Sequence, residues 1–212
     1  MPRHAMPRYP MSGRFVVLEG GDGSGKTTQA ARLSAQLRAR GLVVCETFEP
    51  GATGAGALIR ELLLHRREPI APVTEALLMA ADRAQHVAEQ LAPALERGEW
   101  IVCDRYVASS LVYQGVVRGV GVRVVEELNR GATVGIEPDV VIVLDVPDAI
   151  ARERAGASPD RLEAEGDAFH SAVRDAYRTL ADERDWVVVD GAGDVDTVAA
   201  RVWALVEPLL AR

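Results

Sequence analysis

The stretch Gly20-Gly-Asp-Gly-Ser-Gly-Lys-Thr27 decides the fold of this chain. It matches the phosphate-binding loop pattern G-x-x-x-x-G-K-[ST] at every defined position. Its Lys26 is the only lysine in the chain, and every other long cationic side chain is an arginine. A lysine at this one place indicates a site that needs a compact ammonium group on a flexible stem instead of a planar guanidinium.

The residues on either side of the loop fit the same interpretation. Residues 15–19 are typical of a short buried strand, and residues 27–37 are typical of the helix that should follow it. At such a junction backbone N–H groups surround an anion, and the helix N-terminus adds partial positive charge. We expect Lys26 to contact the β- and γ-phosphates of a nucleotide and Thr27 to ligate Mg²⁺. The loop residues expected to bind the nucleotide are Gly20, Gly23, Ser24, Gly25, Lys26, Thr27 and Thr28. The alternative, a glycine-rich turn without a ligand, would not need the complete motif at this junction.

The composition narrows the class of protein. A length of 212 residues with 48% hydrophobic residues suits one α/β domain with a full core. The formal net charge of −7 argues against non-specific binding of nucleic acid, and no apolar run approaches the length of a membrane span. Residues 1–12 contain three prolines and lack the apolar stretch of a signal peptide, so we expect a disordered tail or an upstream start codon. Cys45 and Cys103 have no metal-ligand spacing and are interpreted as small buried hydrophobic residues in a reducing, cytoplasmic compartment, with a disulfide as the alternative.

Strand and helix patterns alternate along the chain, which predicts a parallel sheet with helices on both faces. The expected strands cover residues 15–19, 42–47, 100–104, 140–145 and 186–190. The expected helices cover residues 27–37, 55–67, 73–97, 122–130, 149–154, 166–184 and 195–210, with Pro93 kinking or splitting the longest one. The predicted fold is therefore a single α/β domain of the phosphate-loop NTPase type, built on five parallel strands.

Charged residues follow two of the later strands, at the sheet edge where ligands bind in such folds. Asp104 is expected to serve Mg²⁺, directly or through water, with a helix cap or a solvated turn as the alternative. Arg105 beside it could clamp a phosphate. Asp145 is evenly balanced between a helix-start role and a site role.

At this point the chain resembles the thymidylate kinase family over about residues 14–212. The resemblance rests on ordered segments: Val17-Leu-Glu-Gly-Gly-Asp-Gly-Ser-Gly-Lys-Thr-Thr28, Glu49-Pro-Gly51, Ile59-Arg-Glu-Leu-Leu63, Leu77-Leu-Met-Ala-Ala-Asp-Arg83, Asp104-Arg-Tyr106, Tyr113-Gln-Gly115, Leu144-Asp-Val-Pro147 and Asp160-Arg-Leu-Glu163. It implies phosphorylation of dTMP by Mg·ATP, a lid at about residues 152–163, and a homodimer. From the charge and the lack of a long apolar run, we expect no nucleic acid and no membrane as partners.

The resemblance also implies roles for individual residues. Asp22 would face the sugar and phosphate of the acceptor, and Arg83 would hold the acceptor phosphate and border the thymine. Arg105 would be a second arginine for that phosphate, and Tyr113 would pack against the deoxyribose, where its bulk disfavours a 2′-hydroxyl. The remaining positions expected to contact the acceptor are Phe48, Pro50, Met79, Ser109, Ser110 and Gln114.

The lid is expected to carry a catalytic arginine. One subgroup of the family has this arginine in the phosphate loop and another has it in the lid; here the loop has no arginine, so the chain resembles the second subgroup. A cation that arrives on lid closure would neutralise the charge on the transferred phosphoryl group. Arg154 is the first candidate and Arg161 the second, while Arg152 is expected near the nucleotide. The alternative for all three is a solvated cationic loop.

Two positions depart from the family pattern. Phe48 replaces an arginine before Glu-Pro-Gly, and Met79 replaces a phenylalanine that stacks on thymine. Both changes leave phosphoryl transfer intact but weaken the expectation of thymine selectivity. A kinase for another nucleoside monophosphate or deoxynucleoside therefore stays open, as does a non-catalytic nucleotide-binding module. A GTP-binding switch is disfavoured because its Asn-Lys-x-Asp motif needs a second lysine.

Overall fold

The structure is a computed structural model that describes residues 13–66, 68–154, 161–162 and 165–211. The expected N-terminal tail, and residues 155–160 and 163 of the expected lid, lie outside the described residues.

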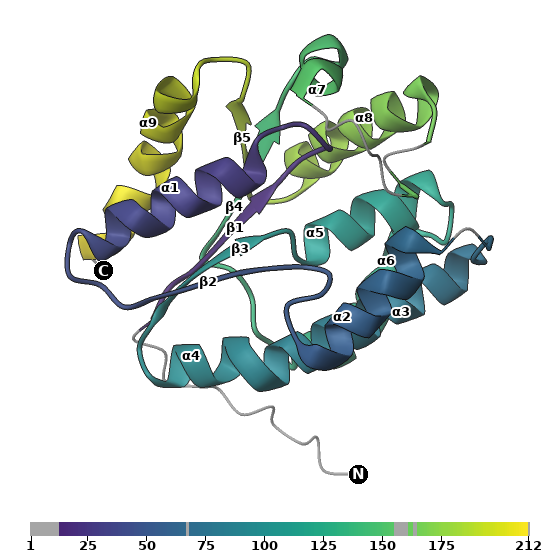
Figure 1. The fold of residues 1–212 in the computed structure, drawn as a ribbon, viewed down its shortest axis with the longest axis horizontal. Coiled ribbons are helices and arrows are strands. Elements are labelled where there is room, and N and C mark those ends of the chain that lie inside the picture. Colours follow the sequence, from purple (N-terminus) through teal and green to yellow (C-terminus); the bar gives the residue numbers. More distant parts are fainter. Residues whose placement is uncertain (1–12, 67, 155–160, 163–164, 212) are drawn as a thin grey trace.

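Five parallel strands form one sheet in the order β2-β3-β1-β4-β5 (Figure 1). The strands are β1 (Phe15–Glu19), β2 (Val44–Phe48), β3 (Trp100–Asp104), β4 (Val140–Asp145) and β5 (Trp186–Asp190). The predicted fold class is confirmed, and four of the strands have the expected bounds. The second strand begins two residues later than predicted and ends at Phe48, beside Asp104 of β3.

Helices cover both faces of this sheet (Figure 1). One face packs against α1 (Lys26–Arg38), α9 (Val195–Val206) and η4 (Glu207–Ala211). The other face carries the remaining helices, with α4, α6 and α8 packed in two adjoining apolar clusters. Their bounds are α2 (Gly54–Arg60), η1 (Glu61–His65), α3 (Pro72–His86), η2 (Val87–Leu91), α4 (Ala92–Glu96), α5 (Val107–Ser110), η3 (Leu111–Val117), α6 (Val122–Thr133), α7 (Asp148–Arg154) and α8 (Asp167–Glu183).

Two helical segments differ from the sequence prediction. The stretch 73–97 is not split at Pro93; a π-helical turn, η2, precedes the proline, which lacks an N–H to bond with the preceding turn. The segment containing α5 and η3 was not predicted. Its side chains from Leu111 to Gln114 are buried in succession, so it has no helical periodicity of burial to detect.

The two cysteines are both free. Cys103 is fully buried as expected, and burial raises the pKa of its thiol. Cys45 is only half-buried, so its interpretation as a core residue is wrong: β2 is an edge strand, and its side chains are covered less completely.

Candidate active site

One cleft of about 1190 Å³ runs along the carboxyl ends of the strands. The loop after central β1 lines its middle, and the segments after β5 and β2 line opposite ends, because those strands are the two edges of the sheet. We call the part lined by Thr28, Gly191, Gly193, Asp194, Val195 and Val198 the donor end. We call the part lined by Phe48, Pro50, Met79, Arg83, Ser110, Tyr113 and Gln114 the acceptor end.

The cleft brings together most of the residues that the sequence predicted. Besides those at its two ends, it is lined by the predicted residues Asp22, Gly23, Ser24, Gly25, Lys26, Thr27, Asp104, Arg105, Ser109 and Arg154. Gly20 and Arg152 instead line a smaller cavity of about 240 Å³ beside the loop. Arg161 lines neither cavity.

Lys26 lies folded over its own loop. Its Nζ donates to the carbonyl of Gly21 at 2.8 Å and to the hydroxyl of Ser24 at 3.4 Å. Only 7% of the residue is exposed, and burial, followed by the nearby Arg105, lowers the pKa of its ammonium group to about 8. Phosphate oxygens in place of these neutral partners would favour the charged form of Lys26.

Thr27 and Asp104 meet between the first turn of α1 and the end of β3. The Thr27 hydroxyl donates to Oδ2 of Asp104 at 2.6 Å. Hydroxyl, carboxylate and phosphate oxygens with water are the ligands that Mg²⁺ prefers, so this donor set fits the ion expected from the sequence.

Asp22 and Arg105 form an ion pair in the middle of the cleft. Burial alone would raise the pKa of Asp22, but the charge of Arg105, with that of Lys26, outweighs it and lowers that pKa. Tyr113 donates to the other oxygen of Asp22 at 3.3 Å. Arg105 has a φ of +72°, an unusual backbone conformation for a residue with a side chain, which is typical of functional sites.

Glu19, the last residue of β1, was not predicted as a site residue. Its carboxyl group supports the Asp22–Arg105 pair through hydrogen bonds with neighbouring side chains. It accepts hydrogen bonds from the Ser109 hydroxyl at 2.6 Å and from the Tyr177 hydroxyl at 2.8 Å. Ser109 also accepts from Arg105 at 3.1 Å. Burial raises the pKa of Glu19, although Arg105 opposes the shift. A carboxylate ending a fully apolar buried strand was the signal that could have identified it.

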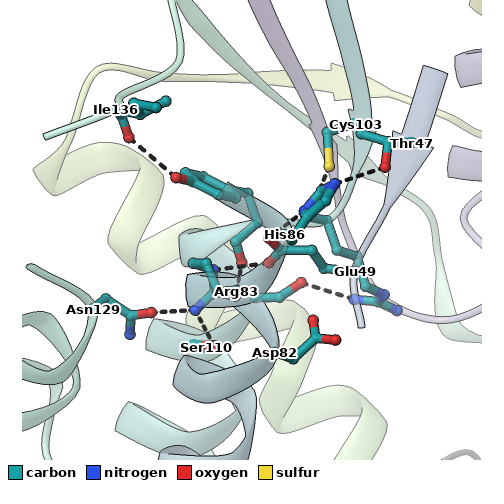
Figure 2. Close-up of polar contacts among 12 residues, drawn as sticks. Thr47, Glu49, Asp82, Arg83, His86, Cys103, Ser110, Asn129 and Ile136 are labelled. Atoms are coloured by element: carbon teal, nitrogen blue, oxygen red, sulfur yellow. Dashed lines mark hydrogen bonds and ion pairs between the residues drawn. The ribbon is translucent and has the colours of Figure 1, made fainter. Parts of the chain in front are cut away.

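Arg83 is almost fully enclosed, with 2% of the residue exposed. Its Nε donates to Glu49 at 2.8 Å, Nη1 to Ser110 at 3.2 Å and to Asn129, and Nη2 to the carbonyl of Tyr106 at 3.0 Å (Figure 2). Among the described residues, these partners leave one N–H of the guanidinium for a ligand. Such an arrangement suits a single acceptor oxygen and not a bidentate phosphate clamp.

Other residues predicted to contact the acceptor already have contacts within the protein. Gln114 donates to Glu75 at 2.9 Å, and Met79 is half-buried at the cleft wall. Phe48 is 45% exposed, and the guanidinium of Arg60 lies 5.7 Å from its ring centre. Arg60 also lines the cleft, so it supplies a cation near the position where the family pattern has an arginine.

The arginines around the expected lid have separate partners. Arg154, at the end of α7, donates to the carbonyls of Gly191 at 2.9 Å and Gly193 at 3.1 Å, at the donor end. Arg161 donates to the carbonyl of Leu63 at 2.6 Å and pairs with Glu75. Arg152 pairs with Asp167 at 2.7 Å on the surface.

Asp145 is held by α8, and it also lines the smaller cavity beside the phosphate loop. Arg174 and Arg178 of α8 donate to its two oxygens, at 2.7 Å and 2.6 Å, and these bonds lower its pKa against the opposing effect of burial. The residue therefore anchors α8 to the end of β4.

The chain matches known proteins over the residues that line both ends of this cleft. The family model for thymidylate kinase matches residues 18–202. A thymidylate kinase from Leifsonia xyli is 50% identical over 194 residues, which cover 90% of this chain and 92% of that protein. One from Thermomicrobium roseum is 47% identical over 203 residues, covering 93% and 96%, and one from Deinococcus radiodurans is 43% identical over 198 residues, covering 92% and 96%. None of the helices in the described part of the chain has the length and apolarity to cross a membrane.

Proposed function

The chain belongs to the thymidylate kinase family and phosphorylates dTMP to dTDP, and from this premise we propose that one cleft transfers the γ-phosphoryl group of Mg·ATP directly to the phosphate of dTMP. The observation that carries the proposal is the Asp22–Arg105 pair, which lies between the phosphate loop and the acceptor end. A phosphate oxygen of dTMP attacks in line, so no nucleophilic side chain is needed. Positioning and charge neutralisation supply the catalysis.

In the middle of the cleft, next to the donor end, Lys26 leaves the Gly21 carbonyl and binds the β- and γ-phosphates. Thr27 and Asp104 would hold Mg²⁺, Asp104 directly or through water. The ion would neutralise charge on the β- and γ-phosphate oxygens. The backbone N–H groups of the loop then orient the phosphate chain at the start of α1.

In the middle of the cleft, next to the acceptor end, the charge of Arg105 attracts the dTMP phosphate, while Asp22 restrains the guanidinium and faces the sugar. Tyr113 packs against the deoxyribose; its ring lies against those of Phe169 and Tyr177, 6.1 and 6.4 Å between centres, so it has little room to move. The free N–H of Arg83 contacts one oxygen at the edge of the acceptor base. Met79 covers the face of that base.

Arg154 is proposed as the lid arginine that neutralises the transferred group, as in the lid-arginine subgroup. Support comes from Gly23, the loop position that faces α7. A Cβ there would lie 2.2 Å from the carbonyl oxygen of Ala151, so α7 approaches the loop closely only because residue 23 has no side chain. Arg154 is one turn further along α7, lines the cleft, and is held by two carbonyl groups that it can leave. Arg161 is the weaker candidate because Glu75 holds its charge.

We also propose a cytoplasmic homodimer. Apolar side chains are exposed along neighbouring helices of one face, among them Leu58 of α2 at 75%, Leu77 of α3 and Val124 of α6. Such a run of exposed apolar residues is typical of a contact between subunits. Light scattering of the wild-type protein and of Leu77→Glu tests it: the substituted chain should become monomeric, and a monomeric wild type contradicts the proposal.

The substrate assignment is tested with a coupled assay of ADP release from Mg·ATP and a panel of acceptors: dTMP, dUMP, UMP, CMP, AMP, GMP and thymidine. The proposal predicts the highest kcat/KM for dTMP. The second candidate, a broader nucleoside monophosphate kinase, rests on Met79 at the position of a stacking ring. Equal kcat/KM for dTMP and dUMP would favour that candidate.

A further inference from the structure

Two residues to which the sequence analysis gave no role lie behind Arg83. Glu49, in the segment after β2, bridges Arg83 and His86: Oε2 accepts from Arg83 Nε at 2.8 Å, and Oε1 lies 2.9 Å from His86 Nδ1 (Figure 2). All three side chains are almost completely buried. His86 occupies the last position of α3, so it lies beneath the acceptor end and does not line the cleft.

The hydrogen bonds beyond His86 fix the number of protons in this cluster. Gln90 donates its Nε2 to the carbonyl of Ala52 at 2.7 Å, so its Oε1 is the acceptor of the 3.1 Å contact with the Thr47 hydroxyl. Thr47 has one hydroxyl proton, and this contact uses it. The oxygen of Thr47 must then accept from His86 Nε2 at 2.7 Å.

With Nε2 donating to Thr47, Nδ1 of His86 faces the Glu49 carboxyl. A bare Nδ1 beside a carboxylate would be two acceptors in contact, so the His86–Glu49 contact must contain a second proton. Arg83 Nε donates to the same carboxyl, which favours the ionised form of Glu49 and leaves the proton on the ring. His86 is then an imidazolium with both ring nitrogens donating.

The charges around the ring are consistent with this state. The titratable and charged groups close to it are Glu49, Asp82 and Arg83, with Cys103 and Tyr106 next to β3. Two cations, His86 and Arg83, then share the cluster with two carboxylates, Glu49 and Asp82. A neutral His86 ring would leave one of its two short contacts without a proton. It would also leave the buried Glu49 carboxylate with Arg83 as its one cationic partner in the cluster.

We propose that His86 is a positioning residue, held as an imidazolium, which fixes Glu49 and through it the orientation of the Arg83 guanidinium at the acceptor end. It rests on the proposed role of Arg83 in binding dTMP. His86 touches no substrate. Its contribution is to keep the one free N–H of Arg83 aimed into the cleft, so its loss should weaken binding of dTMP without affecting ATP or the chemical step.

The charge state is measured first, on the unaltered enzyme labelled with ¹⁵N-histidine. At pH 7.5 the spectrum should show two protonated ring nitrogens for His86, assigned by its loss in His86→Gln. The exposed His65 provides the reference signal for a ring in solvent. One unprotonated ring nitrogen at His86 would overturn the proposal. The charge state is read from the wild-type spectrum, and His86→Gln serves only to assign the signal.

The positioning role is measured by kinetics. His86→Gln keeps the size of the side chain but can no longer donate to both Glu49 and Thr47 as a cation. Its KM for dTMP should rise about tenfold, as for loss of a charge-assisted hydrogen bond, while kcat and the KM for ATP stay within about twofold. His65→Gln should match the wild type. A folded His86→Gln with an unchanged KM for dTMP, or with kcat and both KM values altered together, contradicts a positioning role.

Two further variants separate this inference from the proposed function beneath it. Arg83→Lys tests whether Arg83 binds dTMP at all: an unchanged KM for dTMP would show that the role of Arg83 is wrong. If Arg83→Lys raises that KM and His86→Gln does not, only the inference about His86 fails. In Glu49→Gln the ring should lose its extra proton, and an imidazolium signal that persists there would overturn the pairing.

Discussion

The hydroxyl of Thr27 donates a 2.6 Å hydrogen bond to the carboxylate of Asp104, joining the first turn of α1 to the end of β3. This contact brings together the two oxygen groups proposed to serve Mg²⁺. Thr27→Ala should therefore raise the Mg²⁺ concentration at half-maximal activity by about 10- to 100-fold, the usual effect of removing a group that ligates or orients a metal site. Activity measured against Mg²⁺ concentration checks this. Thr27→Ser, which keeps the hydroxyl, is the matched control, and equal Mg²⁺ dependence of the alanine variant and the wild type would contradict the site.

Gly23 lies against α7, and any side chain there meets the Ala151 carbonyl. Its φ of +72° adds strain to any substitution. Gly23→Ala should displace α7 with Arg154 and lower kcat by roughly 10²-fold, the order expected when a catalytic group moves by about 1 Å. Gly131→Ala in α6 is the control, because no atom lies within 4 Å of its added Cβ. A Gly23→Ala enzyme with the kcat of the control would mean that the close packing of α7 is unimportant.

The carboxyl group of Asp82 makes the free energy of unfolding depend on pH. Burial, followed by the charge of Glu49, raises its pKa from 3.8 to about 6. Between these values the folded protein binds more protons than the unfolded chain, so the contribution of Asp82 to stability falls as the pH rises from about 4 to about 6. Asp82→Asn keeps an acceptor for the Gly51 N–H and removes this loss. Its free energy of unfolding at pH 7.5 should exceed that of the wild type by roughly 1–2 kcal/mol, after solvent screening is allowed for.

Urea unfolding at pH 4.5, 6 and 7.5 measures this effect. The difference between variant and wild type should grow with pH across that range. A constant difference would show that the Asp82 carboxyl does not titrate there.

Tyr113 is expected to separate deoxyribose from ribose by bulk. Tyr113→Ala should reduce the ratio of kcat/KM for dTMP over its ribonucleotide counterpart by roughly tenfold, the order of one small group in a tight pocket. Tyr113→Phe keeps the ring, loses the bonds of the hydroxyl with Asp22 and Arg105, and should retain most of that ratio. The same ratio in both variants would argue against steric exclusion.

Much of the fold could be predicted from the sequence because the signals for its strands and its phosphate loop lie within short stretches of the chain. Short runs of residues identify the phosphate loop and the strands β3, β4 and β5, because the pattern within each run indicates its structure directly. The segment containing α5 and η3 escaped because five successive residues, Leu111 to Gly115, are buried, which removes the periodicity. Most cleft residues could be named through the family resemblance, but their partners could not.

Those partners depend on contacts between distant parts of the chain. Arg161 reaches Glu75 across 86 positions, and this pairing removes it from the cleft although its place in the lid suggested catalysis. Glu49 and His86 are 37 positions apart, and no pattern in the sequence links them to each other. Only the packing of the segment after β2 against α3 makes them one unit.

The central claim is that Arg154 supplies the lid charge for phosphoryl transfer. Its most direct test is kcat at saturating Mg·ATP and dTMP for Arg154→Ala and Arg161→Ala beside the wild type, with binding of both nucleotides confirmed by calorimetry. The account predicts a loss of about 10³-fold for Arg154→Ala, the order known for arginines that neutralise a transferred phosphoryl group, and a much smaller loss for Arg161→Ala. A near wild-type kcat for Arg154→Ala, or a larger loss for Arg161→Ala, would contradict it.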